Sequence, residues 1–356
     1  MAHAAVRILH LEPGEDAGEL TRLLGTARAI AADDLAERFR HAGADDVKVQ
    51  GGAPGEASFD ARLRSIASEL GTGTGLVVLG SGSIVFAAEA DLRALLATAG
   101  SGERRALTNN RFSSDVLAIG DASALANVPA LRGDNALPRW LAEDAGVAVA
   151  ELPDRDRLAF DIDSPLDLEL FRRDARCPPA LVELARAKAQ LLARVADALD
   201  QLAALARNPR AELLVAGRLS ASMLRRVEER SACRIRAFVE ERGLRTAAAG
   251  QRPAASALGL LLDRDGPEAI GALVARLADG AILDSRVLLA HRYGADEAGW
   301  PSAEDRFAGD LLLADRVRDP WLQQLTHHAE SHEVPIVLGA HSLVGPGLAL
   351  ALGLEA

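Results

Sequence analysis

The sequence predicts an α/β protein with a doubly wound, mostly parallel sheet and a second, smaller α/β domain. Short apolar runs alternate with longer runs of helical spacing, which is the order of βαβ units. The chain has 356 residues, which is more than one ordinary hydrophobic core contains. A leucine-rich and alanine-rich run that starts near residue 178 marks a joint between two halves. These three observations together predict two α/β domains.

The first predicted domain covers residues 1–177. Its expected strands read "AVRILHL", "DVKVQG", "GLVVLG", "DVLAIG" and "VAVAELP". Its expected helices cover 29–43, 59–71, 87–100 and 135–146, and the first of them ends on Gly43, a natural C-cap. Because strands alternate with helices, the sheet is expected to be mostly parallel, with ligands beyond the carboxyl ends of its strands.

A connecting helix is predicted over residues 178–207, where Pro178 and Pro179 suit a helix start. The second predicted domain covers residues 208–356. Its expected strands read "AELLVAGRLS", "CRIRAFVEERG", "ALGLLLDRDG" and "VPIVLGAHS". Its expected helices read "PEAIGALVARLADG", "AEDRFAGDLLLADRV" and "DPWLQQLTHHAESH".

Composition excludes several classes of function. The net charge of −11 argues against nucleic acid as a partner, because binding to phosphate backbones needs a basic surface. Two cysteines, Cys177 and Cys233, do not make a disulfide framework. No apolar run reaches the roughly 18 residues of a membrane helix, and the first residues do not resemble a signal peptide. We therefore expect a cytoplasmic protein with no membrane partner, and the sequence leaves homo-oligomer formation open.

Two polar loops of the first domain are candidate ligand sites. Gly80, Ser81, Gly82 and Ser83 follow the most continuous apolar strand, where they either contact a ligand or only permit a tight turn. A second dense set of neutral polar side chains either binds a ligand or stabilises a turn. This set consists of Asn109, Asn110, Ser113 and Ser114.

A carboxylate pair near the end of the first domain is a candidate metal site. Asp161 and Asp163 are two residues apart, so they lie on one side of an extended chain. Mg²⁺ prefers oxygen ligands and keeps waters for substrate phosphates, so this pair predicts a magnesium site with catalytic carboxylates. Ser164 either caps the following helix or contacts the ligand, and a cap is the better interpretation.

The stretch "FDIDSPLDLEL" resembles the "DIDTPEDL" element of the molybdopterin-guanine and 2-phospholactate guanylyl nucleotidyltransferases. "LVVLGSGSIVFAAEADLRALL" resembles their central strand, loop and helix. The resemblance covers about residues 1–175. It implies a doubly wound fold and magnesium-dependent transfer of a nucleoside monophosphate, with Asp161 and Asp163 near metal and acceptor. It also implies that Asn109, Ser113 and Ser114 lie near the acceptor or nucleotide.

The sequence departs from that family at two places. Gly-Ser-Gly-Ser stands where the family has a metal carboxylate, and Glu12, Glu15 and Asp16 crowd the opening loop that would meet a triphosphate. Two hypotheses follow from these differences. The chain is either a divergent magnesium-dependent nucleotidyltransferase, acting on a nucleotide and a phosphorylated small molecule, or an inactive relative that serves as a ligand-binding or scaffold module.

The second domain offers four candidate residues of its own. Asp284 and Arg286 form one polar set, and His341 and Ser342 follow the late strand "PIVLGA". His341 at a strand end is a candidate general base or anion ligand, although a cap or turn is the better interpretation for this pair. No P-loop motif and no nucleophile-elbow motif is present in the sequence.

Overall fold

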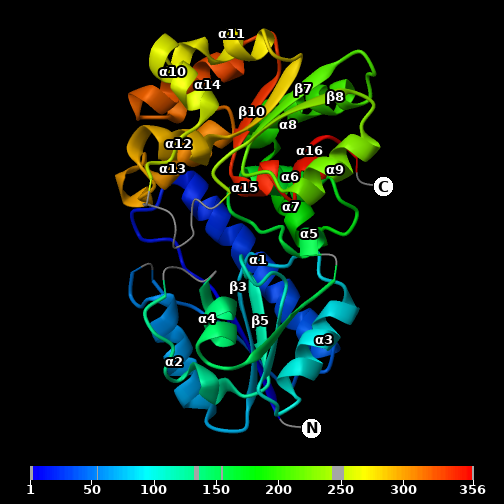
Figure 1. Cartoon of the computed structure of the whole chain (residues 1–356), viewed down its shortest axis with the longest axis vertical. Helices are drawn as coiled ribbons and strands as arrows, with labels where there is room; N and C mark the ends of the chain where they lie inside the picture. The colour runs from blue at the N-terminus through cyan, green and yellow to red at the C-terminus, as the bar shows by residue number, and fades with distance from the viewer. Residues whose placement is uncertain (1–2, 54, 132–135, 154, 243–251, 355–356) are drawn as a thin grey trace. The chain divides into compact units, whose positions relative to one another are not determined.

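The computed structural model describes residues 3–53, 55–131, 136–153, 155–242 and 252–354 (Figure 1). The chain divides into two compact units. Unit 1 comprises residues 1–16 and 25–161, and unit 2 comprises residues 17–24 and 162–356. Helix α1, Glu19–His41, begins in unit 2 and continues in unit 1, so the two units share one helix.

Unit 1 is built on a six-stranded sheet in the order β2-β1-β3-β5-β4-β6. Strands β2, β1 and β3 are parallel, β4 and β6 are parallel, and β5 runs antiparallel to both of its neighbours. The strands are β1 Ala4–Leu9, β2 Asp46–Gln50, β3 Gly75–Gly80, β4 Arg105–Thr108, β5 Val116–Ile119 and β6 Ala148–Glu151. The prediction of a mostly parallel sheet is confirmed.

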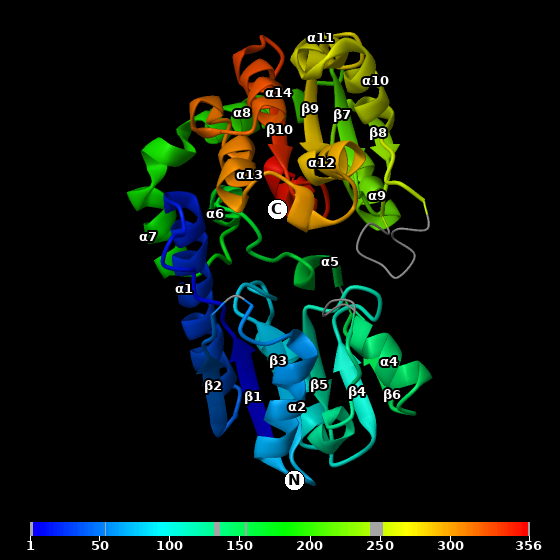
Figure 2. The same ribbon diagram turned by 90° about the vertical axis from the view of Figure 1, so that its left-hand side faces the viewer.

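Helices cover both faces of this sheet (Figures 1 and 2). Residues of α1 and α3 pack in one hydrophobic cluster, and residues of α2 and α4 pack in the other. After α1, the helices of unit 1 are α2 Phe59–Leu70, α3 Glu89–Ala99, the 3-10 turn η1 Ala122–Leu125, α4 Leu137–Glu143 and α5 Arg155–Leu158. The predicted helix over 135–146 corresponds to α4, and its residue 135 lies outside the described residues.

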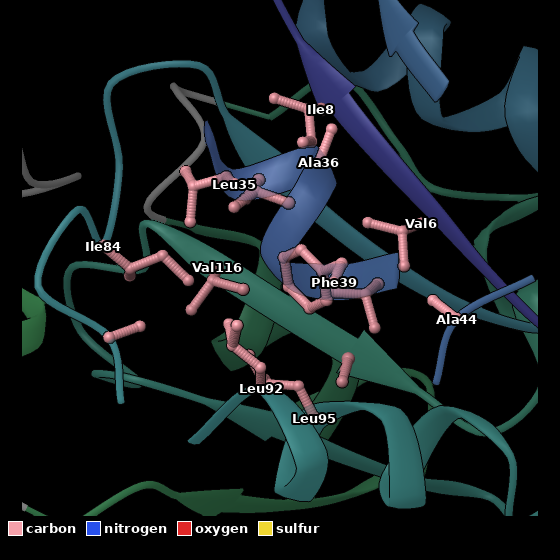
Figure 3. Packing of buried hydrophobic residues seen from close by; sticks show 14 of the residues in the cluster. Val6, Ile8, Leu35, Ala36, Phe39, Ala44, Ile84, Leu92, Leu95 and Val116 are labelled. Carbon is pink, nitrogen blue, oxygen red and sulfur yellow. The ribbon is translucent and has the colours of Figure 1, made fainter. Parts of the chain in front are cut away.

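The core of unit 1 follows from the alternation of side chains along its strands (Figure 3). Val6 and Ile8 of β1 point to the same face as Leu35 and Phe39 of α1, together with Leu92 of α3. All five side chains are almost completely buried. Burial of such side chains contributes about 1.5–3 kcal/mol each, which fixes the register of β1 within the sheet.

Unit 2 is built on a four-stranded sheet in the order β10-β9-β7-β8, and every pair in it is parallel. The strands are β7 Glu212–Gly217, β8 Arg234–Val239, β9 Gly280–Asp284 and β10 Ile336–Gly339. Strands β7, β9 and β10 are almost entirely buried. Continuous apolar runs of this kind are typical of parallel strands covered on both faces.

Helices α10, α11 and α14 lie on one side of this sheet in Figure 1, and α8, α9 and α16 lie on the other. Gly280 lets α8 approach β9 closely, because a Cβ at that position would lie 2.7 Å from Leu202 Cδ2. The longer helices are α7 Pro179–Ala187, α8 Ala189–Ala206, α9 Ala221–Arg230, α10 Ala257–Asp265, α12 Ser285–Tyr293, α13 Ala303–Asp310 and α14 Pro320–Ser331. The shorter ones are α6 Leu166–Phe171, α11 Ile270–Ala275, α15 His341–Val344, α16 Leu348–Ala351 and the 3-10 turns η3 Pro267–Ala269, η4 Glu297–Gly299 and η5 Ala314–Arg316.

The compact units differ from the predicted domain bounds. Residues 162–177 belong to unit 2, and the predicted connecting helix over 178–207 is two helices, α7 and α8, inside unit 2. Unit 2 is therefore the larger of the two units, whereas the sequence predicted a smaller second domain.

One element of unit 2 was assigned to the wrong class. "ALGLLLDRDG" was expected to be a strand and is helix α10. The Ser256 side chain caps the helix by accepting a hydrogen bond from the N–H of Gly259, and Gly266 ends it with a positive φ. A short apolar run fits both classes of element, and here the two caps decide in favour of the helix.

Within the described residues, none of the helices combines the length and the apolar character that crossing a bilayer requires.

Candidate functional sites

Each sheet contains one point at which the order of its strands reverses. In unit 1 the chain moves from β1 to β2 on one side and then to β3 on the other side of β1. In unit 2 it moves from β7 to β8 and then to β9 in the same way. Open α/β sheets bind ligands outside the carboxyl ends of the strands at such a point. The ends of β1 and β3, and of β7 and β9, are therefore the places to look for chemistry.

The predicted loop Gly80–Ser83 lies at the crossover of unit 1. The Ser81 N–H donates to the Leu9 carbonyl at 3.0 Å, and the Ser83 N–H donates to the Gly80 carbonyl at 3.2 Å. Ser81, Gly82 and Ser83 are buried and Gly80 is half-buried. The tight-turn interpretation is thus satisfied, and the same geometry holds two serine hydroxyls at the crossover.

His10 directly follows β1 and contacts this loop. Its Nδ1 lies 3.1 Å from the Ser81 hydroxyl oxygen, and the imidazole is 9% exposed. Burial lowers the pKa of His10 below its ordinary value, with Arg28 acting in the same direction and Glu12 opposing it. In a neutral imidazole, Nδ1 either accepts a hydrogen bond from the Ser81 hydroxyl or donates one to its oxygen, depending on the tautomer. The sequence did not single out His10, because nothing local shows that β1 and β3 are neighbours.

Ile84 follows the loop in an unfavourable backbone conformation. Its φ is +45°, in the left-handed region that β-branched residues avoid, and its side chain is completely buried. Such a conformation costs about 1–2 kcal/mol and persists only where the surroundings impose it. Here the buried side chain in the core of unit 1 holds the turn that positions Ser81 and Ser83.

The second predicted loop of unit 1 is held together by its own polar side chains. The Asn109 amide donates to Asp115 Oδ2 at 2.6 Å and to the Leu158 carbonyl at 3.1 Å, and its oxygen accepts from the Asp115 N–H at 3.0 Å. Asn110 Oδ1 accepts from the N–H of Phe112, a turn contact. The geometry favours the turn interpretation for both asparagines.

The two serines of the same loop were predicted as ligand contacts. The Ser114 hydroxyl lies 2.9 Å from that of Thr108 and donates to the Val116 carbonyl at 3.2 Å. Ser114 is buried and Ser113 is half-buried. Ser114 therefore uses its hydrogen-bonding groups inside the loop.

The predicted carboxylate pair falls at the division of the chain. Asp161 is the last residue of unit 1, whereas Asp163 belongs to unit 2. The Asp163 N–H donates to Asp167 Oδ2 at 2.7 Å, and the Ser164 N–H donates to the same oxygen at 2.7 Å. The Ser164 hydroxyl accepts from the N–H of Leu166 at 3.2 Å. The Ser164 hydroxyl therefore contacts the first N–H of α6 and its own N–H is held by Asp167, while Pro165 occupies the N-cap position.

Asp167 was not predicted as a site residue, yet its environment is unusual. Its side chain is completely buried. Burial, and next the charge of Asp163, raise the pKa of Asp167 to about 7. The Ser342 hydroxyl faces the carboxyl and acts to lower that pKa. Even so, Asp167 Oδ1 and Ser342 Oγ have no hydrogen bond of normal geometry within the described residues.

At the crossover of unit 2, Arg218 and Asp284 form a buried ion pair. Arg218 Nε donates to Asp284 Oδ2 at 2.6 Å and Nη2 donates to Oδ1 at 3.1 Å, with the side chains 9% and 0% exposed. Burial acts to raise the pKa of Asp284, but Arg218 outweighs it, so the pKa is lowered. A bidentate pair of this kind fixes the guanidinium in one orientation.

Gly217, the last residue of β7, makes room for this ion pair. Its φ is +134°, and a Cβ built on it would overlap the Asp284 Cβ. Only glycine adopts this backbone conformation without strain and also lets Asp284 approach.

A second buried ion pair joins Arg286, two residues after Asp284, to Asp310. The two terminal guanidinium nitrogens of Arg286 donate to the Asp310 carboxylate, Nη2 to Oδ2 at 2.7 Å. Burial acts to lower the pKa of Arg286, and the carboxylates of Asp310 and Asp284 outweigh it, so the pKa is raised. The structure thus brings the predicted residues Asp284 and Arg286 into one network of buried charges.

The remaining predicted residues of unit 2 lie at the end of β10. His341 begins α15, is exposed, and acts electrostatically on Asp284. Ser342 is buried next to Asp167. All four predicted residues of this unit therefore belong to the carboxyl ends of β9 and β10.

A small, open pocket lies at the carboxyl ends of β7 and β9, with a volume of about 10 Å³, enough for about one water-sized group. It is lined by Ala216, Gly217, Glu240, Ser256, Leu258, Leu283, Asp284, Val287 and Leu288.

The sequence did not reveal Arg218, Asp310 and Asp167, because their burial depends on partners far away in the sequence. Arg218 could have been found from its position, because it directly follows an apolar strand that ends at Gly217.

Among the described residues, no group of three or more histidine, cysteine, aspartate or glutamate side chains is placed to hold a metal ion. No family model, curated protein or solved structure matches the chain.

Proposed function

We propose that unit 1 binds a nucleotide or another phosphorylated small molecule at the crossover between β1 and β3. The observation that carries this proposal is the contact between His10 and Ser81. Two chemically versatile side chains from strands far apart in sequence meet at the point where open α/β sheets bind ligands. The strained turn at Ile84 supports it, because strain of this kind concentrates at functional sites.

The chemistry of the crossover suits a phosphorylated ligand. Ser81 and Ser83 provide hydroxyl donors, and the His10 imidazole provides a further nitrogen. Arg28 lies near enough to lower the pKa of His10, whereas the carboxylates of Glu12 and Asp33 act to raise it, so the region contains charges of both signs. Since phosphate oxygens accept hydrogen bonds, the hydroxyl and imidazole donors suit a phosphate group.

In this proposal unit 1 is a divergent nucleotidyltransferase-like domain, as the resemblance of its sequence suggests. Two modes of action remain to be distinguished. In the first, the neighbouring residues Asp161 and Asp163 hold Mg²⁺ and the chain transfers a nucleotidyl group to a phosphorylated acceptor. In the second, the domain binds its ligand without turnover. The Gly-Ser-Gly-Ser turn favours the second, because it supplies hydroxyl groups where a metal carboxylate would be expected.

Isothermal titration calorimetry tests both parts of this proposal. ATP, GTP, CTP, UTP and phosphoenolpyruvate are titrated into the wild-type chain, with and without Mg²⁺. We expect binding of at least one probe, weakened about fivefold by Ser81→Ala, the value of one hydrogen bond of about 1 kcal/mol. Gly82→Val is expected to weaken it further by crowding the turn. If no probe binds, or if both variants bind like wild type, the crossover is not the site.

The metal decides between the two modes. Magnesium-dependent transfer predicts that Mg²⁺ strengthens binding and that Asp163→Asn abolishes this gain. Binding without turnover predicts equal affinities with and without Mg²⁺, in wild type and in Asp163→Asn alike. Product analysis of the same mixtures by mass spectrometry gives an independent readout of transfer.

A further inference from the structure

The crossover of unit 2 holds a pocket that the function proposed above does not use. Its volume of about 10 Å³ has room for about one water-sized group and is far below that of a complete small-molecule site. It can therefore receive a single hydroxyl-sized group, with the rest of the ligand outside. Leu258, Val287 and Leu288 give it apolar walls, and Glu240, Ser256 and Asp284 give it polar ones.

Glu240 is the polar wall that remains open to a ligand. It directly follows β8, and its backbone N–H donates to the Gly217 carbonyl at 3.0 Å. Its Oε1 accepts from the N–H of Ala257 at 2.7 Å, which holds the start of α10. Its Oε2 makes neither a hydrogen bond nor an ion pair with any described residue. The side chain is only half-buried, so this oxygen can accept from a bound molecule.

The other two polar walls are already engaged. Both oxygens of Asp284 accept from Arg218, and one of them also accepts from the Arg286 N–H. The Ser256 oxygen accepts from the N–H of Gly259 at 3.1 Å, which leaves the hydroxyl proton for a ligand. The pocket thus presents one free carboxylate oxygen and one hydroxyl donor between aliphatic walls. This combination matches a group that both donates and accepts hydrogen bonds, as a sugar hydroxyl does.

The topology points to the same chemistry. In βαβ units that bind nucleotides, a glycine turn ends the first strand, and an acidic residue about 20 positions later accepts a hydrogen bond from a ribose hydroxyl. Here Gly217 ends β7 with a positive φ, and Glu240 follows β8, 23 positions later. Strands β7 and β8 are parallel and are joined by helix α9. The acidic residue therefore matches the place of the ribose contact in such a unit, whereas the turn after β7, Gly-Arg-Leu-Ser-Ala-Ser, has only the first glycine of the glycine-rich pattern.

We propose that this pocket is a second ligand site, which binds the ribose of a ribonucleotide through Glu240. Arg218 gives the same ligand a positive partner, because its Nη1 makes no hydrogen bond within the described part of the chain. Asp284 then acts as a positioning residue that fixes the guanidinium. This site is built only from residues of unit 2 and does not depend on the site proposed for unit 1.

Comparison of ribonucleotides with their 2′-deoxy counterparts tests the proposal. AMP, GMP, CMP and UMP, and the corresponding deoxynucleotides, are titrated into the full chain by calorimetry. We expect at least one ribonucleotide to bind about tenfold or more tightly than its deoxy form, the value of one hydrogen bond to a charged group. In Glu240→Gln the affinity falls by that factor and the preference for ribose disappears.

The chain offers a matched control at the neighbouring position. Glu241 Oε1 also accepts a backbone N–H, from Ala255 at 3.0 Å, but Glu241 does not line the pocket. Glu241→Gln is expected to bind like wild type. Because glutamine keeps an acceptor for the N–H of Ala257, Glu240→Gln retains the contact at α10, and equal melting temperatures verify that the variant is folded.

Hydrogen exchange locates the binding event and separates this proposal from that for unit 1. Ribonucleotide binding at the pocket protects amides of residues 217–220 and 256–259, whereas binding at the unit 1 crossover protects residues 80–84. Protection confined to 80–84, an unchanged ribose preference in Glu240→Gln, or equal binding of ribonucleotides and deoxynucleotides overturns the proposal.

Discussion

Single residues in this protein differ in whether their neighbours in sequence reveal their role. Asn109 and Ser164 could be interpreted locally, because their hydrogen bonds go mostly to residues within seven positions. Arg218 could not, because its carboxylate partner lies 66 residues away. His10 was missed for the same reason, since Ser81 lies 71 residues away. A sequence pattern shows polar residues at strand ends, but only the strand order shows which of them meet.

The Asn109 hydrogen bonds predict a large effect of substitution on stability. Asn109→Ala leaves buried donors and acceptors without partners, so we expect a loss of about 2–4 kcal/mol in the free energy of unfolding. Asn110→Ala removes a single turn contact and is expected to cost about 1 kcal/mol or less. Urea unfolding measures both. Equal costs for the two variants would contradict the structural role assigned to Asn109.

Substitution of Gly217 is expected to lower stability in two ways, by backbone strain and by a clash with Asp284. Gly217→Ala introduces both a strained φ and a clash with Asp284, so we expect a loss of at least about 2 kcal/mol. Gly294→Ala is the control, because Gly294 has a φ of +90° and nothing within 4 Å of the added Cβ. It should cost only the backbone strain, about 1–2 kcal/mol. A Gly217 variant no less stable than the Gly294 variant would show that the ion pair does not need the glycine.

At the scale of elements, strands with continuous apolar runs were predicted well. β1, β3, β5, β7 and β10 lie where the sequence placed them. Strand β9, "GAILD", was not predicted, because the expected helix ended at Gly280 and residues 281–284 were assigned to no element, and α10 was predicted as a strand. Both errors concern short apolar runs, in which period alone cannot separate a strand from a helix.

The first turn of α1 depends on one carboxylate of unit 2. Glu304 accepts from the N–H groups of Leu20 and Thr21, at 3.0 and 3.1 Å, and from the Thr21 hydroxyl. Glu304→Gln removes the charge and one acceptor, so we expect a loss of about 1–2 kcal/mol. Glu89→Gln, on an exposed helix pair with Arg93, should cost less than about 0.5 kcal/mol. If thermal unfolding shows equal losses for both, Glu304 does not hold the helix end.

For the whole molecule, the sequence predicted two α/β parts but not the division between them. Residues 17–24 and 162–177 belong to unit 2 because their contacts lie there, far from them in sequence. Glu304, for example, binds residues 284 and 283 positions away. Composition and periodicity carry no information about such contacts, so the predicted joint was placed at a change in helical pattern instead.

The buried carboxyl of Asp167 predicts how stability depends on pH. Its pKa is raised to about 7 in the folded chain and is near 3.9 when unfolded, so the folded state binds more protons between these values. Stability is therefore expected to fall as pH rises from about 4 to about 7. For this carboxyl alone the loss is of the order of 4 kcal/mol.

Asp167→Asn isolates this contribution. Asparagine cannot ionise, so the difference in unfolding free energy between variant and wild type should shift in favour of the variant as pH rises through 7. Urea unfolding at pH 5, 6, 7 and 8 measures it. A constant difference across this range would mean that the Asp167 pKa is not raised.

The central claim, that a phosphorylated ligand binds at the crossover of unit 1, is tested most directly by the imidazole signals of His10. The chain carries eight histidines, and His10→Ala assigns the relevant resonance by NMR of ¹⁵N-histidine-labelled protein. The nucleotide or phosphorylated acid that calorimetry identifies is then titrated in. We predict that the His10 signals shift in proportion to ligand saturation and that Ser81→Ala weakens the response. Saturation of the protein with unchanged His10 signals would contradict the claim.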